Sequence, residues 1–481
     1  MNFIEGAYTD VGMINVPENA FYNMSNVNVT YKLGTPMKRP GYTQIGSALE
    51  DGNSITGLFN FRQSESVEKI LATVNNSGDT AMQLFYSTGG TWTEIGAAET
   101  AWSGLEDAKV EMESFLSYCF FVGYDSTDDV WLPVRTLQGT TLGTTLTTDM
   151  PQAKFIKRYR DRLYLVNCYV SGTHYAYRIY FSSVPSAGSI TWDTTNNFLD
   201  VDFSEALTGM GENWDRAVFF TEYSAYLYNQ AQFKKSWDVG CSSHRTIKNS
   251  GAYMFWANRD GVWVSTGGRP NNIAGRVIDF IRAGNASNFF AEVVDEEYHL
   301  YVGDVTVNGI SYSNCSVIFN IPTQTWRIHE YYHNKTVFAR WLNSGQDYLL
   351  MGNAVGEVHR LGKYTDATLL TSDAGNDIQS WAQTGAWAAG APADKKEFMK
   401  VMTYADRAQG VTLKARIVDA NNQGVAEWRT IGELQGMIDE FQVNPESGNF
   451  LQIEISENGK LPYWSLLGMS IIINDDQMLQ N

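Results

Sequence analysis

The sequence predicts an all-β protein, a β-propeller of about seven four-stranded blades with a C-terminal β-sandwich domain. Aromatic residues are abundant, with 26 Tyr, 24 Phe and 14 Trp among 481 residues, while charged residues make up only 18%. Such a composition is typical of strands that pack at least one face into a core. Short alternating runs recur along most of the chain, and their spacing changes near residue 366. The chain is long enough for two folded units.

The expected strands are short runs in which apolar and polar residues alternate. Six of them occupy residues 70–74, 82–86, 163–166, 226–228, 298–302 and 348–351. Each run is bounded by Gly, Asn, Asp or Ser, which is the pattern of half-buried antiparallel strands. Between two such runs, Asp260 and Gly261 predict a hairpin turn, because both residues are common where a positive φ is needed.

Tryptophans that follow a polar turn mark a repeat. Trp92, Trp192, Trp237 and Trp326 are separated by 100, 45 and 89 residues, which correspond to two, one and two units of similar length. A unit of roughly 45 residues is typical of a four-stranded propeller blade. Seven blades fit best, at about residues 51–97, 105–147, 149–195, 198–237, 238–282, 286–330 and 333–363. A six-bladed propeller, or an eighth unit built from the N-terminal segment, is an alternative that the spacing leaves open.

The predicted division of the chain has three parts. Residues 1–50 form an N-terminal arm that leads into the propeller, residues 51–365 form the propeller, and residues 366–481 form a linker and the β-sandwich. The last part begins with a polar stretch at 371–377. Longer apolar runs without the blade period follow at 398–404, 411–417, 450–455 and 466–473. Long strands with no repeat of this kind favour a sandwich.

The charge balance argues against a protein that grips nucleic acid. There are 35 Lys and Arg residues against 53 Asp and Glu residues, a net charge of −18, and binding to phosphates needs clustered cations. An acidic surface would let DNA slide past without sticking, although solubility alone also explains it. The first residues lack the basic and apolar regions of a signal peptide, so we expect synthesis in a cytoplasm and no membrane anchor.

Candidate chemical sites are few, and we predict no enzyme, no cofactor and no metal. Four widely spaced cysteines form no C-x-x-C pattern, so they are expected to be buried free thiols. His329 and His333 have a spacing that suits a metal only on a helix. They flank a strand-like segment, in which such residues lie about 13 Å apart. Residues 87–92 resemble a sialidase box but lack its aspartate, so we interpret them as a blade turn.

One cluster of cations stands out in this acidic chain. Lys154, Lys157, Arg158 and Arg160 lie within seven residues, with aromatic and aliphatic residues between them. In a strand, alternation would divide their charges between two faces. They are therefore candidates for a sheet edge or a subunit interface, where such side chains protect exposed strands, and less so for contact with DNA.

Two stretches resemble a known family. The first runs through Val27, then residues 33–37, and ends in Lys38-Arg39-Pro40-Gly41-Tyr42. The second comprises residues 237–247, 251–257 and 260–263 and includes Val239-Gly240-Cys241 and Asp260-Gly261-Val262. Together they are similar to the β-propeller proteins of tailed bacteriophages that form the tail nozzle, or the tail-stabilisation or plug protein, of short-tailed phages. Residues 319–327 also look like the hairpin of kelch-type blades.

This resemblance implies a structural virion protein without enzymatic activity. Proteins of this kind form a ring, a hexamer in the family, below the portal and adaptor at the head–tail connection. Such a ring retains the packaged genome and conducts the DNA through its lumen during ejection, without sequence-specific binding. The implied neighbours are the adaptor or portal-complex protein above and a needle, spike or tail-fibre protein below. The implied location is the virion, after assembly in the host cytoplasm.

An alternative of a different class is a glycan-binding or glycan-cleaving propeller in a receptor-binding tail appendage. The 14 Trp and 26 Tyr residues could stack on sugars, although such side chains more often fill cores. A glycan site would need exposed aromatic residues and carboxylates at the mouth of the propeller. A ring component would instead need broad contact surfaces.

Overall fold

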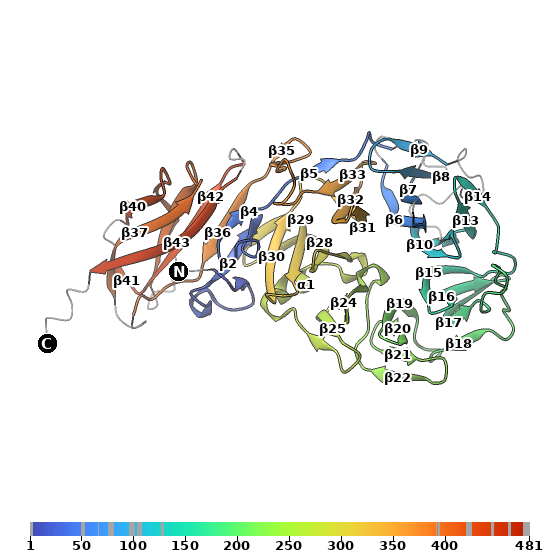
Figure 1. Cartoon of the computed structure of the whole chain (residues 1–481). Helices are drawn as coiled ribbons and strands as arrows, with labels where there is room; N and C mark the ends of the chain where they lie inside the picture. Colours follow the sequence, from blue (N-terminus) through green and yellow to red (C-terminus); the bar gives the residue numbers. More distant parts are fainter. Residues whose placement is uncertain are drawn as a thin grey trace.

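Seven sheets surround one axis in the described part of the computed structural model, and a sandwich lies beside them (Figure 1). The all-β class, with a propeller and a C-terminal sandwich, is confirmed. The structure describes residues 3–49, 53–65, 67–75, 81–95, 102, 108–126, 129–390, 392, 395–419, 426–443, 447–459 and 463–474.

Blades one to four follow each other along the chain, and each is an antiparallel meander whose first strand lies nearest the axis. Blade one contains β6 (Ile55–Ser64), β7 (Val67–Asn75), β8 (Met82–Ser87) and β9 (Trp92–Glu94). Blade two contains β10 (Lys109–Phe115), β11 (Tyr118–Asp125), β13 (Arg135–Gln138) and β14 (Thr141–Gly143), with β12 (Val130–Trp131) paired to β11. Blade three contains β15 (Gln152–Tyr159), β16 (Arg162–Val170), β17 (Thr173–Phe181) and β18 (Phe198–Asp200). Blade four contains β19 (Leu207–Asn213), β20 (Arg216–Thr221), β21 (Ala225–Tyr228) and β22 (Phe233–Trp237).

The remaining blades complete the circle. Blade five contains β23 (Lys248–Ser250), β24 (Tyr253–Asn258), β25 (Gly261–Ser265) and β26 (Asn271–Asn272), followed by the short helix α1 (Ile278–Ala283). Blade six contains β27 (Phe290–Val294), β28 (Glu297–Val307), β29 (Ile310–Asn320) and β30 (Thr325–Glu330). Blade seven contains β31 (Lys335–Asn343), β32 (Gln346–Asn353) and β33 (Val358–Leu361), and its fourth strand is β5 (Tyr42–Gln44) from the N-terminal segment.

Two features differ from the blade boundaries and alternatives expected from the sequence. The expected fourth blade began at residue 198, but β18 at Phe198–Asp200 pairs with β17 and is the outer strand of blade three. The N-terminal segment builds no eighth unit, because β5 pairs antiparallel with β33 and closes blade seven. The first and last parts of the propeller are thus held together by backbone hydrogen bonds between strands that are far apart in sequence.

The sandwich strands come from both ends of the chain. One sheet continues outward from blade six through β1 (Gly6–Ala7), β2 (Ala20–Ser25), β36 (Ser380–Thr384), β42 (Phe450–Glu457), β38 (Thr412–Val418) and β39 (Arg429–Glu433). The facing sheet contains β3 (Val27–Asn28), β4 (Met37–Lys38), β43 (Ser465–Asn474), β37 (Lys396–Asp406), β40 (Ile438–Gln442) and β41 (Ser447–Gly448). The polar stretch at 371–377 forms the small hairpin β34 (Ser372–Asp373) and β35 (Asn376–Asp377) beside β5.

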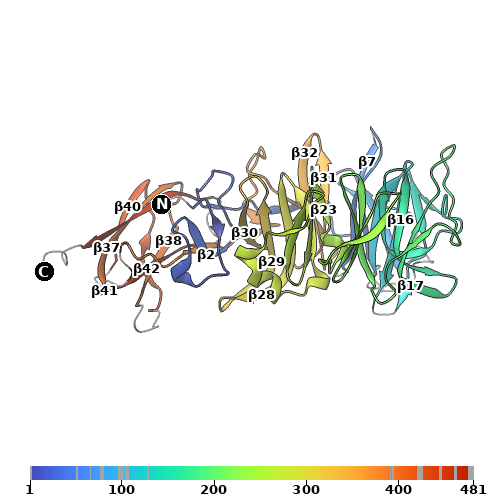
Figure 2. The same ribbon diagram turned by 90° about the horizontal axis from the view of Figure 1, so that it is seen from below.

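Propeller and sandwich are joined by a shared ten-stranded sheet. Strand β30 pairs with β1, β1 pairs with β2, and β2 pairs with β36 of the sandwich. Figure 2 shows the same succession from the edge, with the sandwich strands extending beyond blade six. A single hydrophobic core runs from blades five and six into the sandwich and includes Phe3, Trp326 and Trp464. Rotation between the two parts would therefore break both a hydrogen-bonded sheet and a continuous core.

The segment 38–42 connects three parts of the molecule. Lys38 Nζ pairs with Glu457 Oε2 of the sandwich at 2.9 Å, and both side chains are buried. Arg39 pairs with Asp373 of the hairpin. Gly41 packs against Ser372 so closely that a Cβ there would lie 1.9 Å from its carbonyl oxygen, which explains the glycine. Tyr42 begins the closing strand of blade seven.

The cysteines match their prediction. All four, Cys119, Cys168, Cys241 and Cys315, are buried and free. Burial raises the pKa of the Cys241 thiol to about 11, so this group is not a reactive thiolate at neutral pH. In the described part of the chain, no helix is long and apolar enough to span a bilayer.

Candidate functional site: the axial channel

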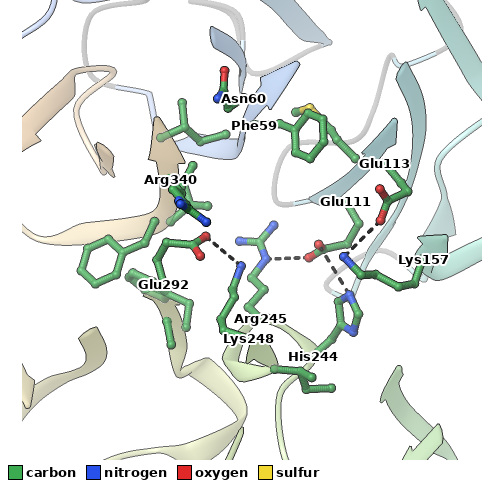
Figure 3. A pocket seen from close by; sticks show the side chains of 18 of the residues that line it. Phe59, Asn60, Glu111, Glu113, Lys157, His244, Arg245, Lys248, Glu292 and Arg340 are labelled. Carbon is green, nitrogen blue, oxygen red and sulfur yellow. Dashed lines mark hydrogen bonds and ion pairs between the residues drawn. The ribbon is translucent and has the colours of Figure 1, made fainter. Parts of the chain in front are cut away.

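A cavity among the described residues lies on the propeller axis, in the position of the central channel of such folds. It has a volume of about 580 Å³ and is lined from all seven blades. Inner strands β6, β10, β15, β19, β27 and β31 contribute, as does the segment around β23 (Figure 3). Successive strand residues alternate between the channel and the neighbouring blades. The titratable residues of its lining are Glu111, Glu113, Lys157, Glu212, His244, Arg245, Lys248, Glu292 and Arg340.

Arg245 crosses the channel. It lies in the short 3-10 helix His244–Thr246 at the start of blade five. Its Nε donates to Glu111 Oε1 of blade two at 2.8 Å, while Nη2 donates to the carbonyl oxygens of Thr56 at 2.8 Å and Val110 at 3.1 Å. Burial alone would raise the pKa of Glu111, but Arg245 and His244 lower it below its ordinary value. The side chain therefore links blade five to blades one and two across the channel.

Two further ion pairs join different blades across the lining. Lys157 Nζ of blade three lies 3.2 Å from Glu113 Oε2 of blade two. Lys248 Nζ of blade five lies 3.0 Å from Glu292 Oε2 of blade six. Figure 3 shows these side chains pointing into the channel toward each other. Glu113 raises the pKa of Lys157, so this lysine stays charged at neutral pH.

His244 is neutral in this setting. The backbone N–H of Met210 donates to its Nδ1 at 3.2 Å, and its Nε2 lies 4.0 Å from Glu111 Oε2. Burial lowers the pKa of His244 to about 4; Glu111 opposes this shift, whereas Lys157, Lys248 and Arg245 reinforce it. The ring of Phe155 packs against it with centroids 4.8 Å apart.

Acidification should therefore destabilise the protein through His244. An unfolded histidine has a pKa near 6.5, so the unfolded chain binds more protons than the folded chain between about pH 6.5 and pH 4. This stabilisation is complete above that range and is lost as the pH falls. Between pH 7 and pH 5, the free energy of unfolding should therefore fall by about 2 kcal/mol less in His244→Gln than in the original chain. Urea titrations of both proteins at the two pH values measure this difference, and parallel losses would contradict it.

The channel offers little for catalysis or metal binding. A basic side chain lies beside each of Glu111, Glu113 and Glu292. It neutralises the negative charge that would otherwise attract a metal ion. Glu212 differs, because burial raises its pKa, against the effect of Lys157 and Arg158. Two aromatic residues of the lining, Phe290 and Phe338, are 5% and 4% exposed, and a third, Phe59, is half-buried.

The four cations singled out from sequence do not form one patch. Lys154 Nζ lies 3.8 Å from the centroid of the Tyr124 ring, and Lys157 faces the channel. Arg158 is exposed and lies over Phe115, with 5.7 Å between Cζ and the ring centroid. Arg160 turns toward blade four, where Nη1 donates to Gln230 Oε1 at 2.9 Å and Nη2 to the carbonyl oxygen of Asp215 at 3.1 Å.

Sequence reasoning did not single out Arg245 or its partner Glu111. They are 134 residues apart and meet only because the propeller is circular. The available signal was the motif 237–247, which contains Arg245 directly before a buried threonine. Lys157 was singled out, but as an edge or interface residue and not as part of a channel.

Comparisons with known proteins add only a likeness of fold. No family model matches the chain, and no curated protein matches it either. The WD40 domain of Pan2 from Neurospora crassa is similar to it with a TM-score of 0.41 and 8% identity, over 70% of this chain and 99% of that domain. The CNH domain of AfRom2 is similar with a TM-score of 0.39 and 9% identity, over 68% of this chain and all (100%) of that domain.

Proposed function

We propose that this chain is a structural protein of a tailed-bacteriophage virion, a ring-forming tail nozzle or hub component below the portal and adaptor. In this role it retains the packaged DNA and conducts it during ejection. The resemblance of segments 33–42 and 237–263 to phage nozzle and plug proteins suggests the role. The observation that carries the proposal is an exposed apolar face at the end of a rigid, elongated chain.

The apolar face lies on the outer side of the sandwich. Tyr404 of β37 is directly opposite Ile438 of β40, and Ile472 of β43 is opposite Lys400. Directly opposite residues share a face of a sheet, as do residues two apart. Ile438 is 63% exposed and the adjacent Met437 is 72% exposed. Exposed apolar side chains grouped in this way, here beside the ion pair of Lys400 and Glu440, mark surfaces that other proteins cover.

This face is well placed for contact between subunits. Strands β37, β40 and β43 lie at the end of the molecule away from blades two and three (Figure 1). The shared ten-stranded sheet fixes its orientation relative to the propeller. A contact made there would thus orient the whole chain, which a closed ring of identical copies requires.

DNA in such a particle would pass between subunits and not through the propeller. The axial cavity of about 580 Å³ is too small for a duplex, and Arg245 crosses it. A lumen surrounded by several copies would inherit the acidic character of a chain with a net charge of −18. Like charges on the wall and on the phosphates would keep DNA from adhering.

The test is a cryo-electron microscopy reconstruction of phage particles that carry this chain. A ring of this chain around an axial channel in the tail supports the proposal. A peripheral position would favour the glycan-binding appendage instead, and absence from the particle would contradict both roles.

A variant tests the apolar face itself. We expect Ile438→Asp to reduce self-association of the purified chain by at least tenfold, because one charge at a subunit contact costs a few kcal/mol. Its melting temperature as a monomer should change little, since the residue is exposed. Val355→Asp, at another exposed site in the turn between β32 and β33, is the matched control. Sedimentation velocity distinguishes the two, and equal association would exclude this face as the contact.

A further inference from the structure

Three metal-ligating side chains meet on blade seven, away from the axial channel. His333 lies between β30 and β31, Glu357 precedes β33, and His359 is within β33. Taking one ligand atom from each, these atoms all lie within 4.8 Å of one another. His359 Nε2 is 3.3 Å from Glu357 Oε2, and the two imidazole rings stack with centroids 5.5 Å apart. The sequence argument against a metal concerned a different pair, His329 and His333.

We propose that His333, Glu357 and His359 bind a divalent transition-metal ion, with Zn²⁺ as the best match. Two imidazole nitrogens and one carboxylate form a ligand set that zinc uses, with water in the fourth position. Ligands at about 2.0–2.2 Å from one tetrahedral ion lie about 3.3–3.6 Å from each other. The pair His359 Nε2 and Glu357 Oε2 already has this separation.

A second observation points to a ligand at the same place. The side chain of His359 is fully buried, and its Nε2 makes no hydrogen bond among the described residues, because Glu357 Oε2 at 3.3 Å is not aligned with its N–H direction. A buried polar atom without a partner is costly, and an ion would supply what it lacks. His333 and Glu357 are only partly buried, so an ion and its water can reach the site.

Neighbouring side chains fix the orientation of the three ligands. The hydroxyl of Tyr42 lies 3.1 Å from His333 Nδ1, and Lys335 Nζ lies 3.4 Å from His359 Nδ1. Each contact occupies one ring nitrogen and leaves Nε2 for the ion. The Nδ2 group of Asn353 donates to Glu357 Oε2 at 2.8 Å and orients the carboxylate. With an ion on His359 Nε2, the ring proton lies on Nδ1 and must be donated, so we expect Lys335 to lose a proton and accept this hydrogen bond.

The position of the site gives the ion a structural role. Tyr42 belongs to β5, the strand from the N-terminal segment that closes blade seven, and its ring packs on His359 with centroids 4.6 Å apart. An ion held by His333 and His359 would therefore stabilise the join between the first and last strands of the propeller. Binding to the folded state alone raises the melting temperature.

The experiment uses the purified full chain after treatment with a chelator. Isothermal titration with Zn²⁺ should give one site per chain with micromolar or tighter affinity, and Zn²⁺ should raise the melting temperature. Co²⁺ in its place should give the intense visible absorption of a tetrahedral ion. His333→Gln, at the partly exposed ligand, should weaken binding at least tenfold and abolish the rise in melting temperature.

His174→Gln in blade three is the control, because His174 contacts Asn167 and lies outside this cluster. It should bind Zn²⁺ as the original chain does. The proposal would be overturned by affinity weaker than about 100 μM, or by equal binding of the His333→Gln and original chains. Unchanged binding in the chain with Glu357→Gln would overturn the assignment of the carboxylate. None of these outcomes depends on the proposed role in a virion.

Discussion

Arg39→Met should lower the free energy of unfolding by about 3–5 kcal/mol, because it leaves the buried Asp373 carboxylate without its countercharge. All five N–H donors of Arg39 are used in the folded chain. Nη1 and Nη2 bind Asp373 at 2.8 and 2.6 Å and also donate to the carbonyl oxygens of Pro40 and Glu330, while Nε donates to Asn26 Oδ1. The Arg39 side chain is fully buried and that of Asp373 is 3% exposed.

The loss should affect propeller and sandwich together. Arg39 contacts blade six through Glu330 and the sandwich through Asn26, which lies between β2 and β3. Arg216→Met is the matched control, because Arg216 pairs with Asp215 at 3.7 Å in an exposed position and should change stability by less than about 1 kcal/mol. Denaturant titration followed by tryptophan fluorescence measures both variants. Similar stability of the two would show that the Arg39 contacts contribute little.

Glu297→Gln should cost about 3–5 kcal/mol for the same physical reason, here with the arginine left unpaired. Glu297 on β28 accepts two hydrogen bonds from Arg327 on β30, one of them 2.5 Å long from Nη1 to Oε1. Burial would raise the pKa of Glu297, yet Arg327 and His299 hold it far below its ordinary value. The glutamine keeps the shape of the side chain but removes the charge that compensates the buried guanidinium.

The expected loss depends on acidity in a defined direction. Because the folded pKa of Glu297 is depressed, its stabilisation is present above the unfolded pKa near 4.3 and is lost as the pH falls below it. The difference between Glu297→Gln and the original chain should therefore shrink on going from pH 7 to pH 3. Asp347→Asn, in the more exposed pair with Arg340, is the control and should have little effect at either pH. A difference that stays constant with pH would contradict the assigned ion pair.

Part of the fold could be predicted because it depends on neighbours in sequence. The strand expected over 298–302 lies within β28, although both of its faces are buried, since His299 and Tyr301 are covered as well as Tyr298 and Leu300. The hairpin expected at Asp260 and Gly261 joins β24 to β25, although its turn lies at Arg259 and Asp260 and Gly261 begins β25. The tryptophan repeat also reflects local structure, since Trp92, Trp237 and Trp326 all lie on outer strands of blades.

Less of the candidate sites could be predicted. The segment 38–42 stood out as a motif, but nothing near it indicates that Lys38 meets Glu457, 419 residues away. Likewise, His333 was compared with His329, its neighbour four residues away, whereas its ring stacks on that of His359. His329 is instead buried beside Arg327, whose Nε lies 3.3 Å from His329 Nε2.

Sequence alone was sufficient for the class of fold, the blade period and the burial of the four cysteines, because strand alternation and turn chemistry act over a few residues. Tertiary structure decided where the ends of the chain go. Strand β5 closes blade seven, and β1 joins blade six to the sandwich. An open sheet edge can pair with any strand that the packing of the chain places beside it. Tertiary structure also decided which side chains form the ion pairs of the channel and the cluster of His333, Glu357 and His359. These side chains meet only when the blades close into a circle, and no local sequence pattern indicates that they are neighbours.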